Sequence, residues 1–156
     1  MRIRKSTEKD AKEIADVLVK SYNIKDLKEG ISVFKNEIKK SHNYIVAEEN
    51  GKIIGIVTWL MHGLPKHQLC ELDRIAVLPE ARGKGLAQEL VKQLIIDVNK
   101  EYKKYGWKLR KLYLLTHTDN TRAQDFYKKV GFKQEATLKE HFYKGKDEYM
   151  MSMFFE

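Results

Sequence analysis

In the N-terminal part of the chain, apolar residues recur three or four positions apart, the spacing of one helix face. The pattern predicts a helix over Glu8–Tyr22, preceded by Thr7, and a weaker helical region within residues 23–42 that ends near Lys40. The apolar faces consist of Ile14, Val17, Leu18 and Tyr22 in the first region and of Ile31, Phe34 and Ile38 in the second.

Short apolar or alternating runs bounded by turn residues predict strands. The expected strands are Arg2–Lys5, Tyr44–Glu48, Lys52–Met61, Cys70–Leu78, Leu109–Thr116, Phe132–Phe142 and Glu148–Phe154. Asn50 and Gly51 join two of them and are a strong hairpin signal. The last two strands form an antiparallel pair around Lys144-Gly145-Lys146.

Helical patterns return over Leu86–Tyr105 and Thr121–Val130, the second with Asn120 as its expected N-cap and Gly131 as its C-terminal stop. A strand, a helix and a strand between Cys70 and Thr116 predict a right-handed parallel crossover. We therefore expect an α+β fold, with a mixed sheet flanked by helices.

The 156 residues suit one domain, 1–156. The longest apolar runs, such as Ile53–Leu60, are too short to cross a bilayer, and the N-terminus has no apolar signal core. The one cysteine, Cys70, cannot form an internal disulfide, which is typical of a reducing compartment. We expect a cytoplasmic protein with no membrane partner.

The net charge of +8 has two interpretations. It could attract phosphates of a cofactor or of a nucleic acid. However, the lysines are spread along the chain and mostly alternate with acids, which favours an ordinary solvated surface. Nucleic-acid binding is therefore the less favoured interpretation of the charge. It would require basic residues clustered on one face.

A glycine-rich turn, Arg82-Gly83-Lys84-Gly85-Leu86-Ala87, leads from the strand into the helix. Such a turn points unpaired N–H groups at whatever lies before the helix, where a phosphate binds well. The turn lacks the Ser or Thr that a Walker loop needs after its lysine, and Gln88 stands where the dinucleotide fingerprint needs a third glycine.

The turn matches R/Q-x-x-G-x-G/A and resembles the acetyl-CoA pyrophosphate loop of the GNAT N-acetyltransferase superfamily. The segment from Asn120 to Phe132 resembles a second GNAT signature, N-x-x-A-x-x-F-Y-x-x-x-G-F. The two motifs also follow the family's element order. The resemblance implies a mixed, mostly antiparallel sheet with one parallel crossover pair, often split beside the strand Cys70–Leu78.

Carried over residue by residue, the resemblance implies a site for acetyl-CoA as cosubstrate. Main-chain groups of one strand would pair with the pantetheine arm, backbone amides of the glycine turn would hold the pyrophosphate, and two residues of the second motif would contact the coenzyme. The implied coenzyme-binding residues are Ile75, Ala76, Val77, Arg82, Gly83, Lys84, Gly85, Leu86, Ala87, Asn120 and Phe126.

Acetyl transfer needs a neutral amine and a proton for the departing thiolate. Glu71 stands where many GNAT enzymes carry a glutamate base, and Asp73 faces the same way by strand alternation. A surface role or a water chain is the alternative for both. The N–H of Ile75 or a neighbour could polarise the thioester carbonyl. Tyr127 is the candidate general acid, with core packing as its alternative.

His62 and His67 flank a turn and could contact the acceptor, or be ordinary loop residues. No set of His, Cys, Asp and Glu has zinc spacing, so we expect no metal, and Cys70 is expected to be an inert buried thiol. The leading hypothesis is an acetyl-CoA-dependent N-acetyltransferase acting on a small, polyamine-like or peptide amine by direct attack in a ternary complex. The alternatives are a coenzyme A-binding regulatory module and a protein N-terminal or lysine acetyltransferase. A homodimer is expected only by analogy.

Overall fold

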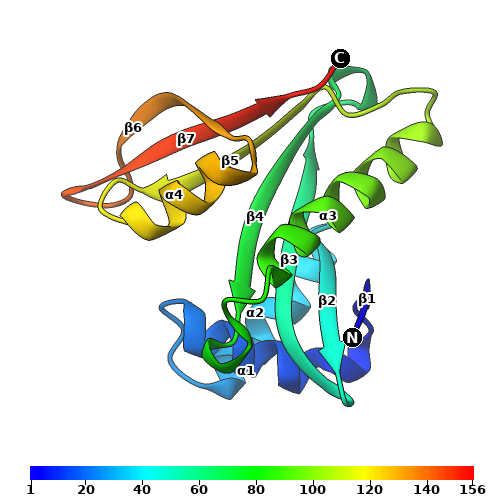
Figure 1. The fold of residues 1–156 in the computed structure, drawn as a ribbon, viewed down its shortest axis with the longest axis vertical. Helices are drawn as coiled ribbons and strands as arrows, with labels where there is room; N and C mark the ends of the chain where they lie inside the picture. Colours follow the sequence, from blue (N-terminus) through cyan, green and yellow to red (C-terminus); the bar gives the residue numbers. More distant parts are fainter. The chain divides into compact units, whose positions relative to one another are not determined.

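The computed structural model describes all of residues 1–156, which form seven strands and four α-helices (Figure 1). The strands are β1 (Arg2–Lys5), β2 (Asn43–Glu49), β3 (Lys52–His62), β4 (Leu69–Val77), β5 (Lys111–His117), β6 (Lys133–Tyr143) and β7 (Lys146–Phe154). The helices are α1 (Ala11–Ser21), α2 (Leu27–Lys39), α3 (Leu86–Lys103) and α4 (Thr121–Val130). No helix combines the length and apolar content that a membrane span needs.

The strand order is β1-β2-β3-β4-β5-β7-β6, in which β4 and β5 are a parallel pair and β5 and β7 are antiparallel. The expected α+β fold with one parallel crossover is therefore confirmed. Hydrogen bonding between β4 and β5 covers only three residue pairs, from Leu69↔Lys111 to Glu71↔Tyr113, although β4 has nine residues. Such limited pairing agrees with the split sheet that the resemblance implied.

Most boundaries differ from the predicted ones by a few residues, and the differences have local causes. Residues Glu8–Asp10 form a 3-10 turn before α1, in which the Asp10 carboxylate accepts from the Thr7 N–H at 2.7 Å. β5 begins at Lys111 rather than Leu109, because the Leu109 N–H donates to Asn99 instead of to a neighbouring strand. Two further 3-10 turns, Pro65–His67 and Pro79–Ala81, were not predicted.

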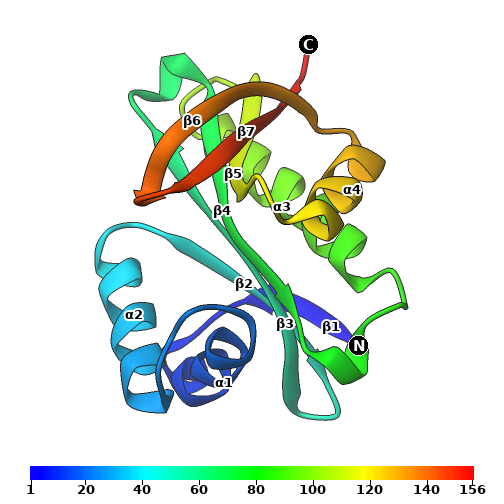
Figure 2. The same ribbon diagram turned by 90° about the vertical axis from the view of Figure 1, so that its left-hand side faces the viewer.

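The chain divides into two compact units. The first contains residues 1–60 and 74–97, and the second contains residues 61–73 and 98–156. The first is built on β1, β2 and most of β3, with α1 and α2 lying side by side (Figure 2). Gly30 allows this close approach, because a Cβ there would lie 2.8 Å from the Cβ of Ala15.

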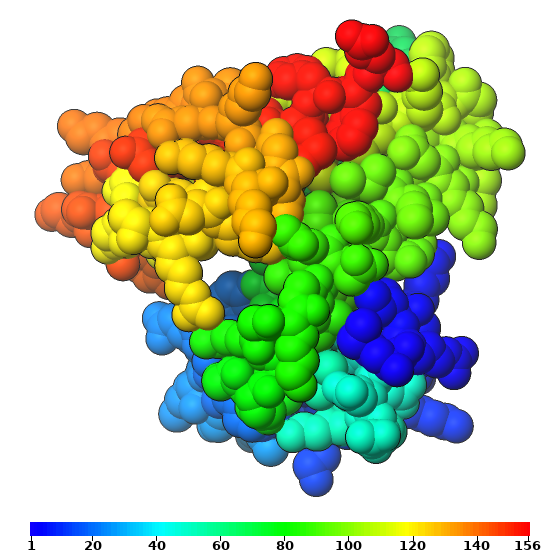
Figure 3. Space-filling model, viewed as in Figure 1, coloured from blue at the N-terminus to red at the C-terminus, as the bar shows by residue number.

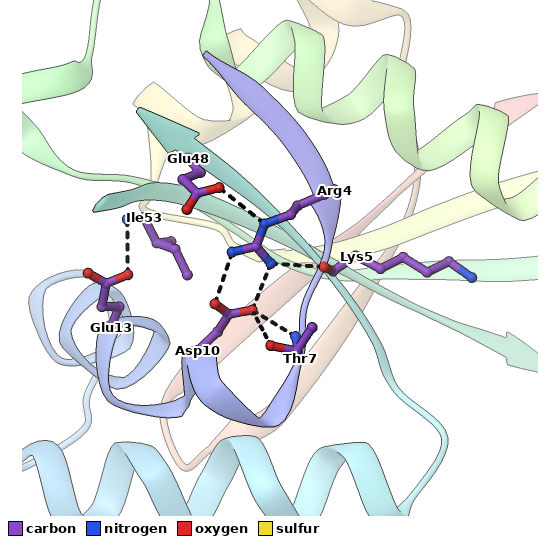
Figure 4. Close-up of polar contacts among 7 residues, drawn as sticks. All are labelled: Arg4, Lys5, Thr7, Asp10, Glu13, Glu48 and Ile53. Carbon is purple, nitrogen blue, oxygen red and sulfur yellow. Dashed lines mark hydrogen bonds and ion pairs between the residues drawn. The ribbon is translucent and has the colours of Figure 1, made fainter. Parts of the chain in front are cut away.

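An ion-pair network joins β1, β2 and the turn before α1 (Figure 4). Arg4 contacts both oxygens of Asp10, at 2.8 and 3.0 Å, and Glu48 at 3.2 Å. The hydrogen bond from Arg4 is the main cause that lowers the pKa of Asp10, and Asp10 in turn raises the pKa of Arg4. Each group thus stabilises the charged form of the other.

The second unit contains the antiparallel strands β5, β7 and β6 together with α4. Tyr102 is fully buried there, and its hydroxyl donates to the Leu69 carbonyl at 2.9 Å. Both units have their own apolar interior. The buried residues include Ile14, Leu18, Ile45 and Ile56 in the first unit, and Leu109, Leu112, Leu114 and Phe132 in the second.

Candidate functional site

The turn before α3 presents a row of unused backbone donors. The N–H groups of residues 83–87 make no hydrogen bond within the protein. Only the N–H of Arg82 is used, and it donates to the Pro79 carbonyl at 3.3 Å. Unpaired N–H groups at the start of an 18-residue helix are suited to hold an anion. The turn lies at the molecular surface, in the green segment of Figure 3.

Gly83 and Gly85 have φ values of +80° and +77°, where side chains other than glycine are strained. A Cβ at either position would meet nothing within 4 Å, so the space in front of the turn is open. Lys84, between them, is exposed. The turn is therefore open and carries a positive charge, and its role in binding a diphosphate stays a prediction.

Behind the turn, the start of α3 packs closely against β3. A Cβ at Gly55 on β3 would lie 3.3 Å from side-chain atoms of both Leu86 and Leu90, and 3.2 Å from the Ala76 carbonyl oxygen. Gly55 therefore lets the first turn of α3 and the end of β4 approach β3 closely. The side chain of Arg82 turns back and donates from Nε to the Val77 carbonyl at 3.0 Å, so it also holds the turn against the strand.

The main chain of β4 at Ile75 already has a partner. The Tyr22 hydroxyl accepts from the Ile75 N–H and donates to the Ile75 carbonyl, both at 2.9 Å. The guanidinium of Arg74 lies 4.9 Å from the centre of the Tyr22 ring and donates to Glu37 at 3.0 Å. The resemblance implied that this Ile75 N–H is available to the coenzyme, but here it is bonded to Tyr22.

In the second unit, Asn120 begins α4. Its side-chain oxygen accepts from the Ala123 N–H at 3.2 Å, and the helix ends at Gly131 with φ 115°. The predicted cap and stop are thus confirmed. The buried Gln124 was not predicted to matter, yet its amide donates to the carbonyls of His117 and Thr118, both at 3.0 Å. Gln124 therefore fixes the turn that precedes Asn120.

Tyr127 packs within an aromatic group. Its ring centre lies 5.6 Å from that of Phe126 and 5.8 Å from that of Phe132. Burial raises the pKa of Tyr127 to about 12. The phenol is consequently protonated at neutral pH, the state that a proton donor needs. Packing explains its position equally well, so its role as general acid stays a prediction.

Glu71 lies at the centre of a hydrogen-bonded cluster in the second unit. Its Oε1 atom lies 2.8 Å from Nε2 of His62 and 3.3 Å from the Tyr113 hydroxyl. The strand register places Glu71 directly opposite Tyr113. Burial is the main cause that raises the pKa of Tyr113, and the charges of Glu71 and Asp73 add to it.

The sequence predicted Glu71 as a base and His62 as a contact of the acceptor, but it did not pair the two, and it did not single out Tyr113. The parallel pairing of β4 with β5, which the crossover already implied, is the signal that could have suggested Tyr113. Cys70, next to Glu71, is buried and forms no disulfide, as expected.

Comparisons with known proteins identify the family of this chain. The model of the acetyltransferase (GNAT) family matches residues 11–132. An uncharacterized N-acetyltransferase of Methanocaldococcus jannaschii is 29% identical over 149 residues, which cover 88% of this chain and 62% of that protein. The spermidine N(1)-acetyltransferase of Escherichia coli is 34% identical over 107 residues, which cover 67% of this chain and 52% of that protein. The chain thus spans between about half and two thirds of these relatives.

Among solved structures, a variant of the spermidine N-acetyltransferase of Vibrio cholerae has a TM-score of 0.78 at 21% identity. The match covers 99% of this chain and 95% of that one, and it shows a shared fold. The family match includes both motifs that carried the resemblance. The chain belongs to the GNAT family of acetyltransferases.

Proposed function

We propose that this protein is an acetyl-CoA-dependent N-acetyltransferase that moves an acetyl group to a primary amine. The row of unpaired N–H groups at residues 83–87 carries this proposal. Within a GNAT chain, a diphosphate is the group that such a row fits. Arg82 and Lys84 add positive charge beside it.

The remaining coenzyme contacts follow the family motif. The main chains of Ala76 and Val77 on β4 would face the pantetheine arm. The N–H of Ile75 would also do so once its hydrogen bond to the Tyr22 hydroxyl breaks. The Asn120 side-chain oxygen is used for the α4 cap, but its amide nitrogen is available to donate to the coenzyme. Phe126 would pack beside it.

Acetyl-CoA supplies an activated thioester, whose acetyl carbon forms a bond to the amine nitrogen as the carbon–sulfur bond breaks. The acceptor ammonium loses two protons in this reaction, one to solvent and one to the sulfur. The residues around Glu71 would remove the first proton, and Tyr127 would protonate the thiolate. Of the two acidic candidates, Glu71 comes first because it stands where many GNAT enzymes carry a glutamate base, and Asp73 comes second.

The acceptor class is part of the proposal. Polyamines are the first compounds to test, because one curated relative and one structural neighbour carry the name of spermidine acetyltransferases. Other small amines and peptides with a free N-terminus or lysine are the next classes.

The test measures thiol release from acetyl-CoA in the presence of polyamines, amino acids, aminoglycosides and peptides. We expect amine-dependent release with a product one acetyl group heavier by mass spectrometry. Tight acetyl-CoA binding without release for any amine would instead indicate a coenzyme A-binding module. If the protein neither binds acetyl-CoA nor releases thiol from it, residues 82–87 are not a pyrophosphate-binding turn.

A further inference from the structure

His62, Glu71 and Tyr113 form a polar cluster, here called the Glu71 cluster, that brings together the end of β3, the start of β4 and the start of β5. The side chain of Glu71 is 15% exposed and that of His62 is 35% exposed. The carboxylate is therefore mostly enclosed, whereas the imidazole reaches solvent.

The hydrogen-bond pattern determines which nitrogen of His62 carries the proton. An ionised carboxylate can only accept, so both His62 Nε2 and the Tyr113 hydroxyl must donate to Oε1 of Glu71. A neutral imidazole with its proton on Nε2 has a lone pair on Nδ1. No group of the protein bonds to Nδ1 of His62.

We propose that His62 Nδ1, rather than Glu71, accepts the proton of the acceptor ammonium; this rests on the N-acetyltransferase function proposed above. Oε1 of Glu71 already accepts from two donors, and the Glu71 side chain is only 15% exposed, so the carboxylate is poorly placed to meet an incoming ammonium. Nδ1 of His62 accepts no hydrogen bond within the protein and belongs to a side chain that is 35% exposed. Glu71 is then a positioning residue, which orients the imidazole and stabilises the imidazolium.

The proton balance follows from this geometry. The ammonium gives one proton to Nδ1, which leaves a neutral amine and an imidazolium with protons on both nitrogens. The amine attacks the acetyl carbon, and its second proton leaves with the sulfur as the thiol. The half-exposed imidazolium passes its proton from Nδ1 to water and returns to its starting tautomer.

The neighbouring groups support this role. Tyr113 faces His62 with a ring separation of 5.6 Å, and its raised pKa keeps it a donor to Glu71 across the working pH range. Glu71 is the acidic group that faces the imidazole, while Asp73 and Cys70 act on the Tyr113 phenol. No cation is paired with the cluster to oppose protonation of His62.

His62→Gln provides the sharpest test, because the glutamine amide can still donate to Glu71 but has no basic Nδ1. We expect kcat/KM to fall roughly 100-fold, the usual contribution of a general base, while the Kd for acetyl-CoA stays within about twofold. The decline of kcat/KM at low pH should also disappear. His141→Gln, which replaces an exposed histidine on β6, is the control and should behave as wild type.

His62→Ala extends the test, since added imidazole should restore part of the turnover of this variant. Glu71→Gln should lower kcat but keep the decline of kcat/KM at low pH. A His62→Gln enzyme with the wild-type rate and pH profile would overturn the proposal. A decline of kcat/KM at low pH that disappears only in Glu71→Gln would also overturn it. If the wild-type protein acetylates no amine, the failure lies with the proposed function, and the proposal on His62 falls with it.

Discussion

The hydroxyl of Tyr22 satisfies both main-chain groups of Ile75, accepting from the N–H and donating to the carbonyl at 2.9 Å each. The two residues are 53 positions apart, and Tyr22 is the first residue after α1. A side chain thus occupies a place where a neighbouring strand would otherwise pair. The same main-chain groups are those that the family motif assigns to the pantetheine arm.

Tyr22→Phe should remove both hydrogen bonds while keeping the ring under Arg74. We expect a loss of about 1–3 kcal/mol in the free energy of unfolding, because the Ile75 groups lose their partner. The Kd for acetyl-CoA should fall, since the coenzyme no longer competes with Tyr22. Urea denaturation and calorimetric titration measure the two effects. Tyr102→Phe, which loses one buried hydrogen bond in the second unit, should lower stability without changing the Kd.

Gly85→Ala should weaken acetyl-CoA binding at least tenfold, because a methyl group would enter the open space in front of the turn and the positive φ would be strained. Gly51→Ala is a matched control: its φ is +76°, its Cβ would also meet nothing within 4 Å, and it lies in the β2–β3 hairpin. If both variants lose the same stability but only Gly85→Ala weakens acetyl-CoA binding, the turn at Gly85 binds the phosphates. If the two variants have the same Kd for acetyl-CoA, this role of the turn is contradicted.

Asn120→Asp separates the two roles of Asn120. Aspartate is as good an N-cap as asparagine, so thermal stability should change little. However, the variant lacks the amide donor and adds a negative charge, so the Kd for acetyl-CoA should rise. Asn120→Ala should lose about 1 kcal/mol of stability as well. An unchanged Kd in both variants would restrict Asn120 to capping α4.

Tyr127→Phe should lower kcat roughly 100-fold if the phenol protonates the thiolate, with little effect on the Kd for acetyl-CoA. Because burial raises the pKa of Tyr127 to about 12, its deprotonation should cause no loss of activity below about pH 10. Steady-state rates across pH test both points. Tyr105→Phe, at an exposed tyrosine, is the control, and full activity of Tyr127→Phe would assign Tyr127 to packing.

The Arg4–Asp10 pair should make stability depend on pH at the acidic end. The pKa of Asp10 is lower in the folded protein than in the unfolded chain, so at acidic pH unfolding takes up a proton. The stabilisation is therefore present above about pH 4 and is lost as the pH falls through the folded-state pKa of Asp10. Asp10→Asn should cost roughly 2 kcal/mol at pH 7 and much less at pH 2. Asp16→Asn, which breaks the exposed pair with Lys20, should leave stability nearly unchanged at either pH, because solvent screens that pair. Urea titrations at several pH values provide the comparison.

Much of the fold could be predicted because its signals are local. The segment Thr121–Val130 carries its own cap at Asn120 and its own stop at Gly131, and its boundaries were predicted correctly. The hairpin at Asn50-Gly51 likewise depends on residues that are adjacent in the sequence. Boundaries were predicted less well where a distant side chain decides them, as Asn99 does at Leu109.

For the site, the sequence alone determined the glycine turn and the family motifs, because backbone conformation at Gly83 and Gly85 depends on residue type. Only the tertiary structure decided that Tyr22 holds the main chain of Ile75 and that Glu71 is bonded to His62 and Tyr113. These partners come from separate segments. A hydrogen bond between them depends on strand register and on loop paths, which no local pattern of residues encodes.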